Sequence, residues 1–225
     1  MGQGIAEVLT FAIGVAISPV PIIAVILMLF SRRAKVNGPV FLAGWVLALV
    51  VVSGVVYAIS DAGSVDTSSG ASDSVSWLKI VFGVLFLFLA FRQWRSRPAP
   101  GSDPAMPKWM QGIDGFTPAK AFGIGVLLAG VNPKNLLLTA GAATGLAELG
   151  LSTTDAVVSI VVFVIVGSLT IAGPVVYYLA GGEGAKTRLD EMKGWLAAHN
   201  AAVMAVLFVV FGVDLIAKGL APLTG

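Results

Sequence analysis

Two short polar stretches with prolines interrupt apolar parts of the chain. They are Ser18-Pro19-Val20-Pro21 and Asn132-Pro133-Lys134-Asn135. A proline removes one backbone donor from a helix and leaves the carbonyl one turn earlier without its partner. In lipid, such a break persists only where it is buried in protein or lines a wet cavity. We therefore expect these stretches, called here the first and second breaks, to form one substrate site; the alternative is a pair of packing kinks.

Lys134 is the ionisable residue of the second break. A charged side chain at the centre of a membrane costs about 2.5–3.5 kcal/mol, so such a residue is a functional candidate by default. Counted from residue 119 at 1.5 Å per residue, Lys134 would lie about 22 Å along its helix. That depth disfavours the alternative, in which the ammonium group reaches the headgroup layer. We expect Lys134 to attract an anionic group of the substrate.

Asp214 and Lys218 are the charged residues of the last apolar stretch. Asp214 would lie at a depth similar to that of Lys134, so these two side chains could pair. Lys218 is one helical turn from Asp214 and competes for the same carboxylate. The sequence leaves both pairs open, and it predicts a coupling or ion-pair role for Asp214 and Lys218.

Other chemistries have no suitable residues. The chain has no cysteine and one histidine, which argues against thiol catalysis, disulfides and thiolate or histidine metal sites. No phosphate-binding loop and no nucleophile–base pair is visible. We therefore expect no catalytic residues, no metal, no cofactor and no enzymatic activity.

The elements that would position the two breaks are membrane helices. Hydrophobic residues make up 57% of the 225-residue chain and charged residues 12%, whereas about 25% of a typical soluble domain is charged. Six apolar stretches approach or exceed the roughly 20 residues that a membrane span needs. They are continuous rather than alternating, so they indicate helices and not barrel strands. The six stretches are 8–30, 39–60, 75–91, 121–147, 156–182 and 198–220.

The basic residues predict the orientation of these helices. Eleven of the 14 Lys and Arg residues fall in three segments, 32–35, 92–120 and 186–193. Cytoplasmic loops of membrane proteins carry an excess of Lys and Arg. We therefore expect a multi-pass protein of the plasma (inner) membrane with both termini outside. The net charge of +2 is explained by these loops and does not indicate a nucleic-acid partner.

Two internal similarities predict an inverted repeat. Phe11-Ala-Ile-Gly-Val15 resembles Phe122-Gly-Ile-Gly-Val126, and Val81-Phe-Gly-Val84 matches Val210-Phe-Gly-Val213. With three spans in each half, the halves insert in opposite directions, as in many transporters. We predict an all-α single membrane domain (1–225) of six helices, the first and fourth of them broken. Residues 5–91 would form the first repeat, 119–221 the second, and 92–118 a cytoplasmic or interfacial connector.

The order of these features resembles the LysE superfamily of exporters, and more closely its GAP branch of peptidoglycolipid and sulfolipid addressing proteins. The resemblance implies a six-helix inner-membrane protein that moves glycolipids or other envelope lipids to the cell surface. It does not identify the lipid. The residues that carry it are Ser18-Pro19-Val20-Pro21-Ile22, Asn132-Pro133-Lys134-Asn135-Leu136, His199-Asn200-Ala201, Phe211-Gly212-Val213 and Lys218-Gly219-Leu220.

Three functions remain open at this stage. The first is transport of a membrane lipid or glycolipid, and the second is export of amino acids or other small solutes. The third is an accessory role beside a larger lipid exporter, and the chain could also form a homodimer. One Lys, one Asp and several Asn side chains suit an anion or a zwitterion better than a divalent cation, which would need several carboxylates.

Overall fold

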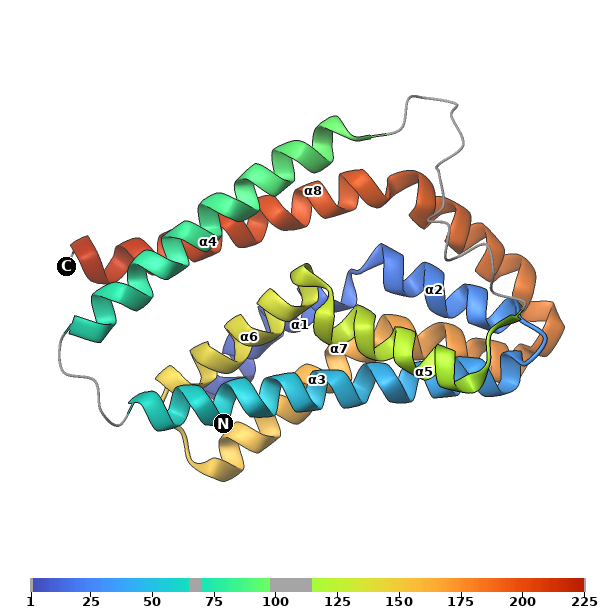
Figure 1. Cartoon of the computed structure of the whole chain (residues 1–225), viewed down its shortest axis with the longest axis horizontal. Coiled ribbons are helices and arrows are strands. Elements are labelled where there is room, and N and C mark those ends of the chain that lie inside the picture. The colour runs from blue at the N-terminus through green and yellow to red at the C-terminus, as the bar shows by residue number, and fades with distance from the viewer. Residues whose placement is uncertain (1, 65–69, 98–114, 225) are drawn as a thin grey trace. The chain divides into compact units, whose positions relative to one another are not determined.

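The computed structural model describes residues 2–64, 70–97 and 115–224, and all regular structure in these ranges is helical (Figure 1). Helices predominate because the apolar stretches satisfy their backbone groups internally. The elements are α1 (Gly2–Ala16), α2 (Pro19–Phe30), α3 (Ala34–Ser64), α4 (Gly70–Arg95), α5 (Pro118–Val126), the π-helix η2 (Leu127–Val131), α6 (Pro133–Glu148), α7 (Thr153–Gly181), the 3-10 helix η3 (Gly182–Ala185) and α8 (Lys186–Thr224).

Two stretches in the described part of the chain are long and apolar enough to cross a membrane. They are Ala34–Ala62 and Thr153–Ala221, and the second, at 69 residues, includes α7, η3 and most of α8. Two bent helix pairs bring the number of candidate spans to as many as four if each pair counts as one span. The protein is therefore an all-helical membrane protein with two broken helix pairs.

The residues at the helix ends explain where several helices begin and end. Thr117 caps α5 by accepting from the backbone N–H of Lys120, and Pro118 takes the first helical position, where no N–H is needed. Ser152 caps α7 by accepting from the N–H of Asp155 at 3.2 Å. Gly182 ends α7 with a φ of 55°, a backbone conformation that glycine adopts without strain.

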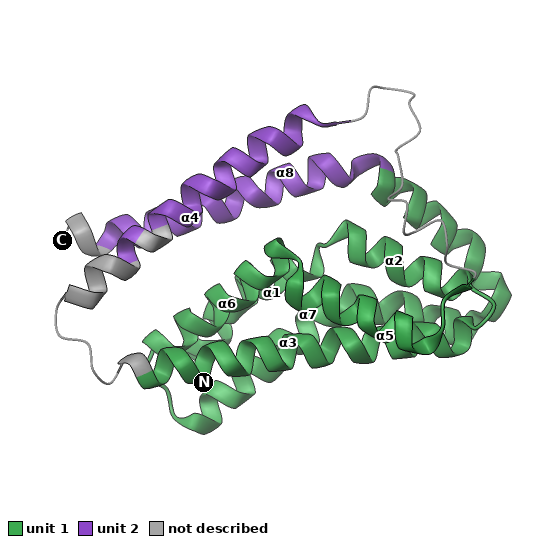
Figure 2. Ribbon diagram, viewed as in Figure 1, with its two compact units in different colours: residues 1–64, 105–197 green, residues 65–104, 198–225 purple. Residues whose placement is uncertain are grey.

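The chain divides into two compact units (Figure 2). Unit 1 comprises Met1–Ser64 and Ala105–Ala197, and unit 2 comprises Val65–Pro104 and Ala198–Gly225. Unit 1 thus contains both expected breaks. Within the described residues, unit 2 is built on α4 and the C-terminal part of α8.

Unit 1 is organised around α3 and α7, which contact each other. α3 also packs against α5, η2 and α6, while α1 packs between α6 and α7 (Figure 1). Phe41, Trp45 and Leu49 of α3 are fully buried, and their spacing of four places them on one face. Helix α2 lies against α3 and α7, and its residues from Pro21 to Leu29 are buried. A broken helix is therefore enclosed by protein, as its free backbone groups require.

Unit 2 contains a close contact between α4 and α8. A Cβ atom added to Gly83 would meet the main-chain oxygen of Gly212 at 2.7 Å, and one added to Gly212 would meet that of Gly83 at 2.9 Å. Nearer the other end, a Cβ on Gly219 would meet the oxygen of Ser76 at 2.7 Å. Small residues allow two helix backbones to approach in this way. The two Val-Phe-Gly-Val segments thus face each other through their glycines.

The segment between the apolar stretches 156–182 and 198–220, whose basic residues 186–193 indicated a cytoplasmic loop, is helical. η3 leads directly into α8 at Lys186. Charged pairs three residues apart support the first turns of α8, with Lys193 Nζ 2.5 Å from Asp190 Oδ1 and Arg188 Nη1 3.5 Å from Glu191 Oε2. At the junction of η3 and α8, Lys186 Nζ lies 2.7 Å from Glu183 Oε2 in a further ion pair.

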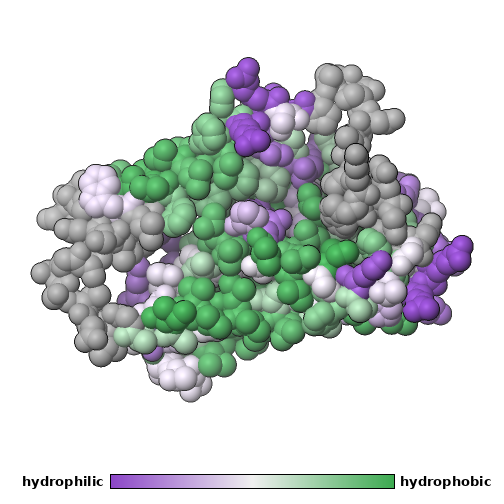
Figure 3. All heavy atoms as spheres, viewed as in Figure 1, coloured by the Kyte–Doolittle hydropathy of each residue, from purple (hydrophilic) through white to green (hydrophobic). Residues whose placement is uncertain are grey.

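Apolar side chains cover much of the visible surface in both units (Figure 3). The exposed ones include Phe88 and Phe91 of α4 and Ile165 and Leu169 of α7, each more than half exposed. A water-soluble monomer rarely exposes so much contiguous apolar surface. These faces are suited to contact with lipid tails.

Candidate functional site

The first break lies at Ser18, between α1 and α2. The residue before a proline is disfavoured from the helical region because the proline ring clashes with its backbone. Ser18 accordingly has φ −123° and ψ 90°, and Pro19 begins α2. The axes of α1 and α2 differ by 56° as a result. The same dipeptide therefore ends one helix and starts the next.

The prolines of the first break leave two carbonyls without their helical donors, since Pro19 and Pro21 have no N–H. The first is the oxygen of Val15, and the hydroxyl of Ser18 lies 2.6 Å from it. The second is the oxygen of Ile17, and the ammonium group of Lys134 donates to it at 2.9 Å. Both carbonyls therefore accept hydrogen bonds from polar side chains of the two breaks.

A third carbonyl of the first break, that of Ala16, receives a hydrogen bond from α7. The Thr170 hydroxyl lies 2.6 Å from the Ala16 oxygen. We did not predict a role for Thr170 from the sequence. In the sequence, Thr170 is recognisable as a hydroxyl residue within the apolar stretch 156–182. No sequence rule assigns its hydroxyl to a carbonyl 154 positions away.

The second break lies at Asn132 and has the same local cause. Asn132 precedes Pro133, adopts φ −57° and ψ 120°, and caps α6 by accepting from the N–H of Lys134 at 3.1 Å. The segment Pro118–Val131 and α6 are bent by 59° at this point. Both breaks thus place a proline at the first position of a helix that starts inside the protein.

The π-helix η2 immediately before the second break leaves one carbonyl for a side chain. The N–H of Asn132 bonds to Leu127 O at 2.9 Å, five residues back. In that register the oxygen of Leu128 would pair with residue 133, which is proline and has no N–H. The side-chain amide of Asn135 donates to Leu128 O at 2.8 Å instead. Asn135 therefore stabilises the break that precedes it.

Three side chains join the two breaks in one hydrogen-bonded cluster. The Lys134 ammonium donates to Ser18 Oγ at 2.5 Å, in addition to Ile17 O. The Ser18 hydroxyl also lies 3.0 Å from Asn135 Oδ1, and its single proton can serve Val15 or Asn135 but not both. Lys134 is 6% exposed, Ser18 3% and Asn135 fully buried. We call these three residues the break cluster.

The break cluster combines a buried lysine with two helix N-termini. Lys134 has no acidic partner within hydrogen-bond or ion-pair distance among the described residues, and two of its three protons have partners. Helices α2 and α6 also begin here, and the N-terminus of each helix carries a partial positive charge. A buried cation beside two helix N-termini is an arrangement that can receive an anion.

A family model described as Sap, sulfolipid-1-addressing protein, matches residues 8–221. The chain belongs to this family. Neither the search of curated proteins nor the search of solved structures found a match.

Membership of the sulfolipid-1-addressing protein family confirms the resemblance drawn from the sequence motifs. The matched range contains both breaks, the break cluster and the α4–α8 contact. Membership suggests a role in lipid or glycolipid addressing.

The remaining predicted site residues fall into two groups, one near the break cluster and one in unit 2. Pro19 and Pro21 are buried beside the break cluster, Asn132 is half-buried and Pro133 is exposed. Asp214 lies in unit 2, and its Oδ2 atom is 3.5 Å from Lys218 Nζ. That distance describes an ion pair rather than a hydrogen bond. Asp214 and Lys134 belong to different units, and each has a partner within its own unit.

One further polar group lies near the break cluster. Thr139 is one helical turn beyond Asn135 on α6, and its hydroxyl oxygen is buried with no hydrogen-bond partner in the described part of the chain. Residues four apart share a helix face. A buried hydroxyl without a partner is costly, so Thr139 is available to a bound group.

Proposed function

We propose that this protein moves an anionic lipid or glycolipid across the inner membrane toward the cell surface, and that it has no enzymatic role. The break cluster would receive the headgroup. The observation that carries the proposal is Lys134, a buried cation whose partners are a hydroxyl and a carbonyl and not a carboxylate. The family's name refers to a sulfolipid, and the headgroup of a sulfolipid is anionic.

The charge of the break cluster supports an anionic substrate. A buried ammonium costs several kcal/mol of desolvation unless a counter-charge or good hydrogen bonds compensate it. Lys134 has two hydrogen bonds and one further proton to offer. An anionic oxygen bound there would supply the missing charge, and the N-termini of α2 and α6 would stabilise it further.

A six-helix inverted repeat, part of this proposal, would give the substrate alternating access from both sides. The two bends are of similar size, 56° and 59°. The Gly83 and Gly212 contact in unit 2 is reciprocal, and these two glycines occupy the same position in the two Val-Phe-Gly-Val segments.

A lipid substrate requires a path that opens sideways. Only the headgroup would pass the break cluster, while the acyl chains stay in the bilayer. The broken helices favour such movement, because α2 is joined to α1 through two non-helical residues, Ile17 and Ser18, and α6 is joined to η2 through Asn132. These positions are natural hinges.

Reconstitution into liposomes tests the proposal. Flipping of fluorescent phosphatidylglycerol, flipping of fluorescent phosphatidylcholine and efflux of an amino acid would be measured side by side. We expect flipping of the anionic lipid above the rate in protein-free liposomes, and little flipping of the zwitterionic one. Amino-acid efflux without lipid flipping would favour a small-solute exporter. No activity in any assay would favour an accessory subunit and would contradict the proposal.

A further inference from the structure

A groove between α4 and α8 lies within unit 2 and has no part in the break cluster. It has a volume of about 430 Å³, and its lining is apolar. Phe91 and Trp94 line it on α4, and Val206 and Val210 line it on α8. Phe91 is 60% exposed and Val206 is 58% exposed, so the groove is open to the surroundings of the unit.

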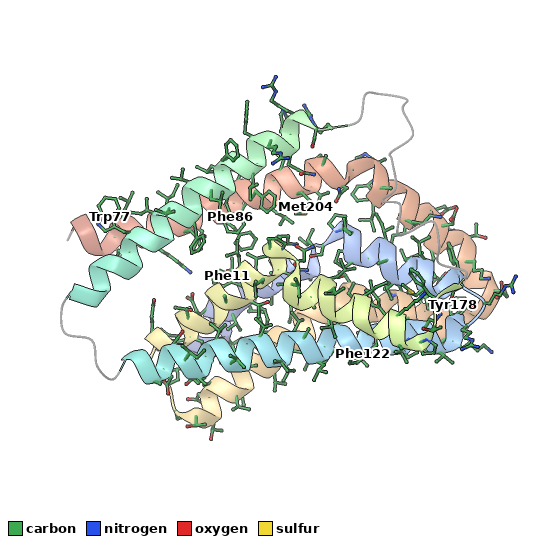
Figure 4. All side chains as sticks on the ribbon, in the orientation of Figure 1. Phe11, Trp77, Phe86, Phe122, Tyr178 and Met204 are labelled. Carbon is green, nitrogen blue, oxygen red and sulfur yellow. The ribbon has the colours of Figure 1, made fainter. Side chains whose placement is uncertain are left out.

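The crossing of the two helices explains the groove. α4 and α8 run antiparallel, since Ser76 meets Gly219 and Gly83 meets Gly212. These glycines hold the backbones together on one side of Phe86, whose ring lies 5.4 Å from that of Phe208 (Figure 4). Beyond this ring pair two buried alanines, Ala90 of α4 and Ala205 of α8, line the groove. Small side chains at this end leave space that a larger residue would fill.

Two arginines lie near the C-terminal end of α4, next to the groove. The guanidinium carbon of Arg97 lies 3.3 Å from the centre of the Trp94 ring, and that of Arg95 lies 5.6 Å from the centre of the Phe91 ring. Both rings line the groove. Stacking on an aromatic face orients a guanidinium group. Two guanidinium groups therefore lie beside aromatic residues that line the groove.

We propose that this groove binds one anionic phospholipid or sulfolipid molecule, with an acyl chain along α4 and α8 and the headgroup on Arg95 and Arg97. Guanidinium groups bind phosphate and sulfate oxygens in a bidentate manner. Basic pockets between membrane helices on the cytoplasmic side bind such headgroups, and the positive-inside rule places this end of α4 in the cytoplasm. Trp94 is of the residue type that gathers at the headgroup layer.

The dimensions of the groove fit part of an acyl chain. From Leu87 to Trp94 the helix rises about 10 Å, which accommodates the upper part of one chain while the remainder stays in the bilayer. A water-soluble anion would use the arginines but not the apolar lining. A lipid uses both, and this combination of charge and apolar surface decides between them. The proposal does not depend on transport at the break cluster.

Native mass spectrometry tests the headgroup contact. The purified full chain would be released from detergent containing equal amounts of phosphatidylglycerol and phosphatidylcholine, and bound lipids would be counted. The Arg95→Gln/Arg97→Gln protein should retain roughly 30-fold less phosphatidylglycerol than wild type, because each of the two basic residues near the membrane contributes about 1 kcal/mol. Its retention of phosphatidylcholine should not change.

The matched control is Arg32→Gln/Arg33→Gln, which removes two exposed arginines from the connection before α3. It should retain phosphatidylglycerol within about twofold of wild type, since the headgroup does not touch these residues. An equal loss in both double variants would show that surface charge alone attracts the lipid, and the proposal would be wrong.

A second pair of variants tests the apolar part of the groove. Val206→Trp would fill the groove and should lower retention of both lipids several-fold. Val213→Trp, two helical turns along the same helix and 54% exposed, lies outside the groove lining and should have no effect. Unchanged lipid retention in Val206→Trp, confirmed as folded by its thermal unfolding, would overturn the proposal. Loss of a dimer in that variant without loss of lipid would instead assign the groove to a second copy of this chain.

Discussion

The ammonium group of Lys134 donates a hydrogen bond of 2.9 Å to the main-chain oxygen of Ile17. Ile17 needs this donor because Pro21, one turn further along the chain, has no N–H. A charged side chain of the second break therefore completes the backbone of the first. An anion that accepts the third proton of Lys134 would therefore lie beside the first break, on the same ammonium group that completes its backbone.

Replacement of Lys134 separates its charge from its hydrogen bond. Lys134→Gln keeps a donor for Ile17 or Ser18 but removes the positive charge. We expect this variant to fold normally and to flip anionic lipid at least about tenfold more slowly, because a hydrogen bond to a charged group is worth about 1.5–3 kcal/mol. Liposome flipping assays at equal protein abundance would measure the change.

Lys134→Met removes the hydrogen bond as well as the charge. It should lower stability by about 1–3 kcal/mol, the usual cost of an unsatisfied buried polar group, in addition to abolishing transport. Lys120→Met, at an exposed lysine near the start of α5, is the matched control and should resemble wild type. Full activity in Lys134→Gln would show that transport does not need the positive charge and would contradict the prediction.

Pro133→Ala tests the origin of the second bend. Alanine restores an N–H that can bond to Leu128 O, and it no longer keeps Asn132 out of the helical region. We expect the 59° bend to relax and transport to fall several-fold. Spin labels at positions 120 and 149 would then report a longer distance across the break. Pro118→Ala, at the start of α5, is the control, and an unchanged distance in Pro133→Ala would contradict the prediction.

Gly83→Ala tests the contact between α4 and α8. The new Cβ would lie 2.7 Å from Gly212 O and 2.6 Å from Ile216 Cγ1, so a backbone must move. Overpacking of this kind costs about 1–3 kcal/mol, and the midpoint of thermal unfolding should fall. Gly54→Ala on α3 meets nothing within 4 Å. It should be neutral or stabilising by up to about 1 kcal/mol, as alanine is in a helix, and equal midpoints for the two variants would refute the prediction.

Single cysteines test the orientation in the membrane, since the chain has none of its own. Thr154→Cys, at the exposed start of α7, should react with an impermeant thiol reagent in intact cells because we expect it outside. Arg33→Cys should react only after the membrane is permeabilised. The reverse pattern would place both termini in the cytoplasm.

Both breaks could be located from the sequence because their cause is local. A residue before a proline leaves the helical region whatever surrounds it, and Ser18 and Asn132 do so in the structure. The membrane class follows from composition in the same way. The helical start of α8 was missed, because its charged residues indicate an aqueous location equally well for a loop and for a solvated helix.

The contacts of the break cluster could not be predicted from the sequence. Sequence alone marked Ser18, Lys134 and Asn135 as candidates by residue type, and it left the partner of Lys134 open. The tertiary structure decides that Lys134 donates to Ile17 and Ser18, and that Asn135 donates to Leu128. The six-span inverted repeat and the orientation in the membrane remain predictions.

The sequence by itself determined the helical membrane class, the family resemblance and the positions of the two breaks, since these depend on composition and on neighbouring residues. Only the tertiary structure decided which carbonyl each polar side chain satisfies. The reason is physical. A proline specifies that a carbonyl loses its donor, but the replacement donor can come from any segment that packs nearby, and for Ile17 it comes from a lysine 117 positions away.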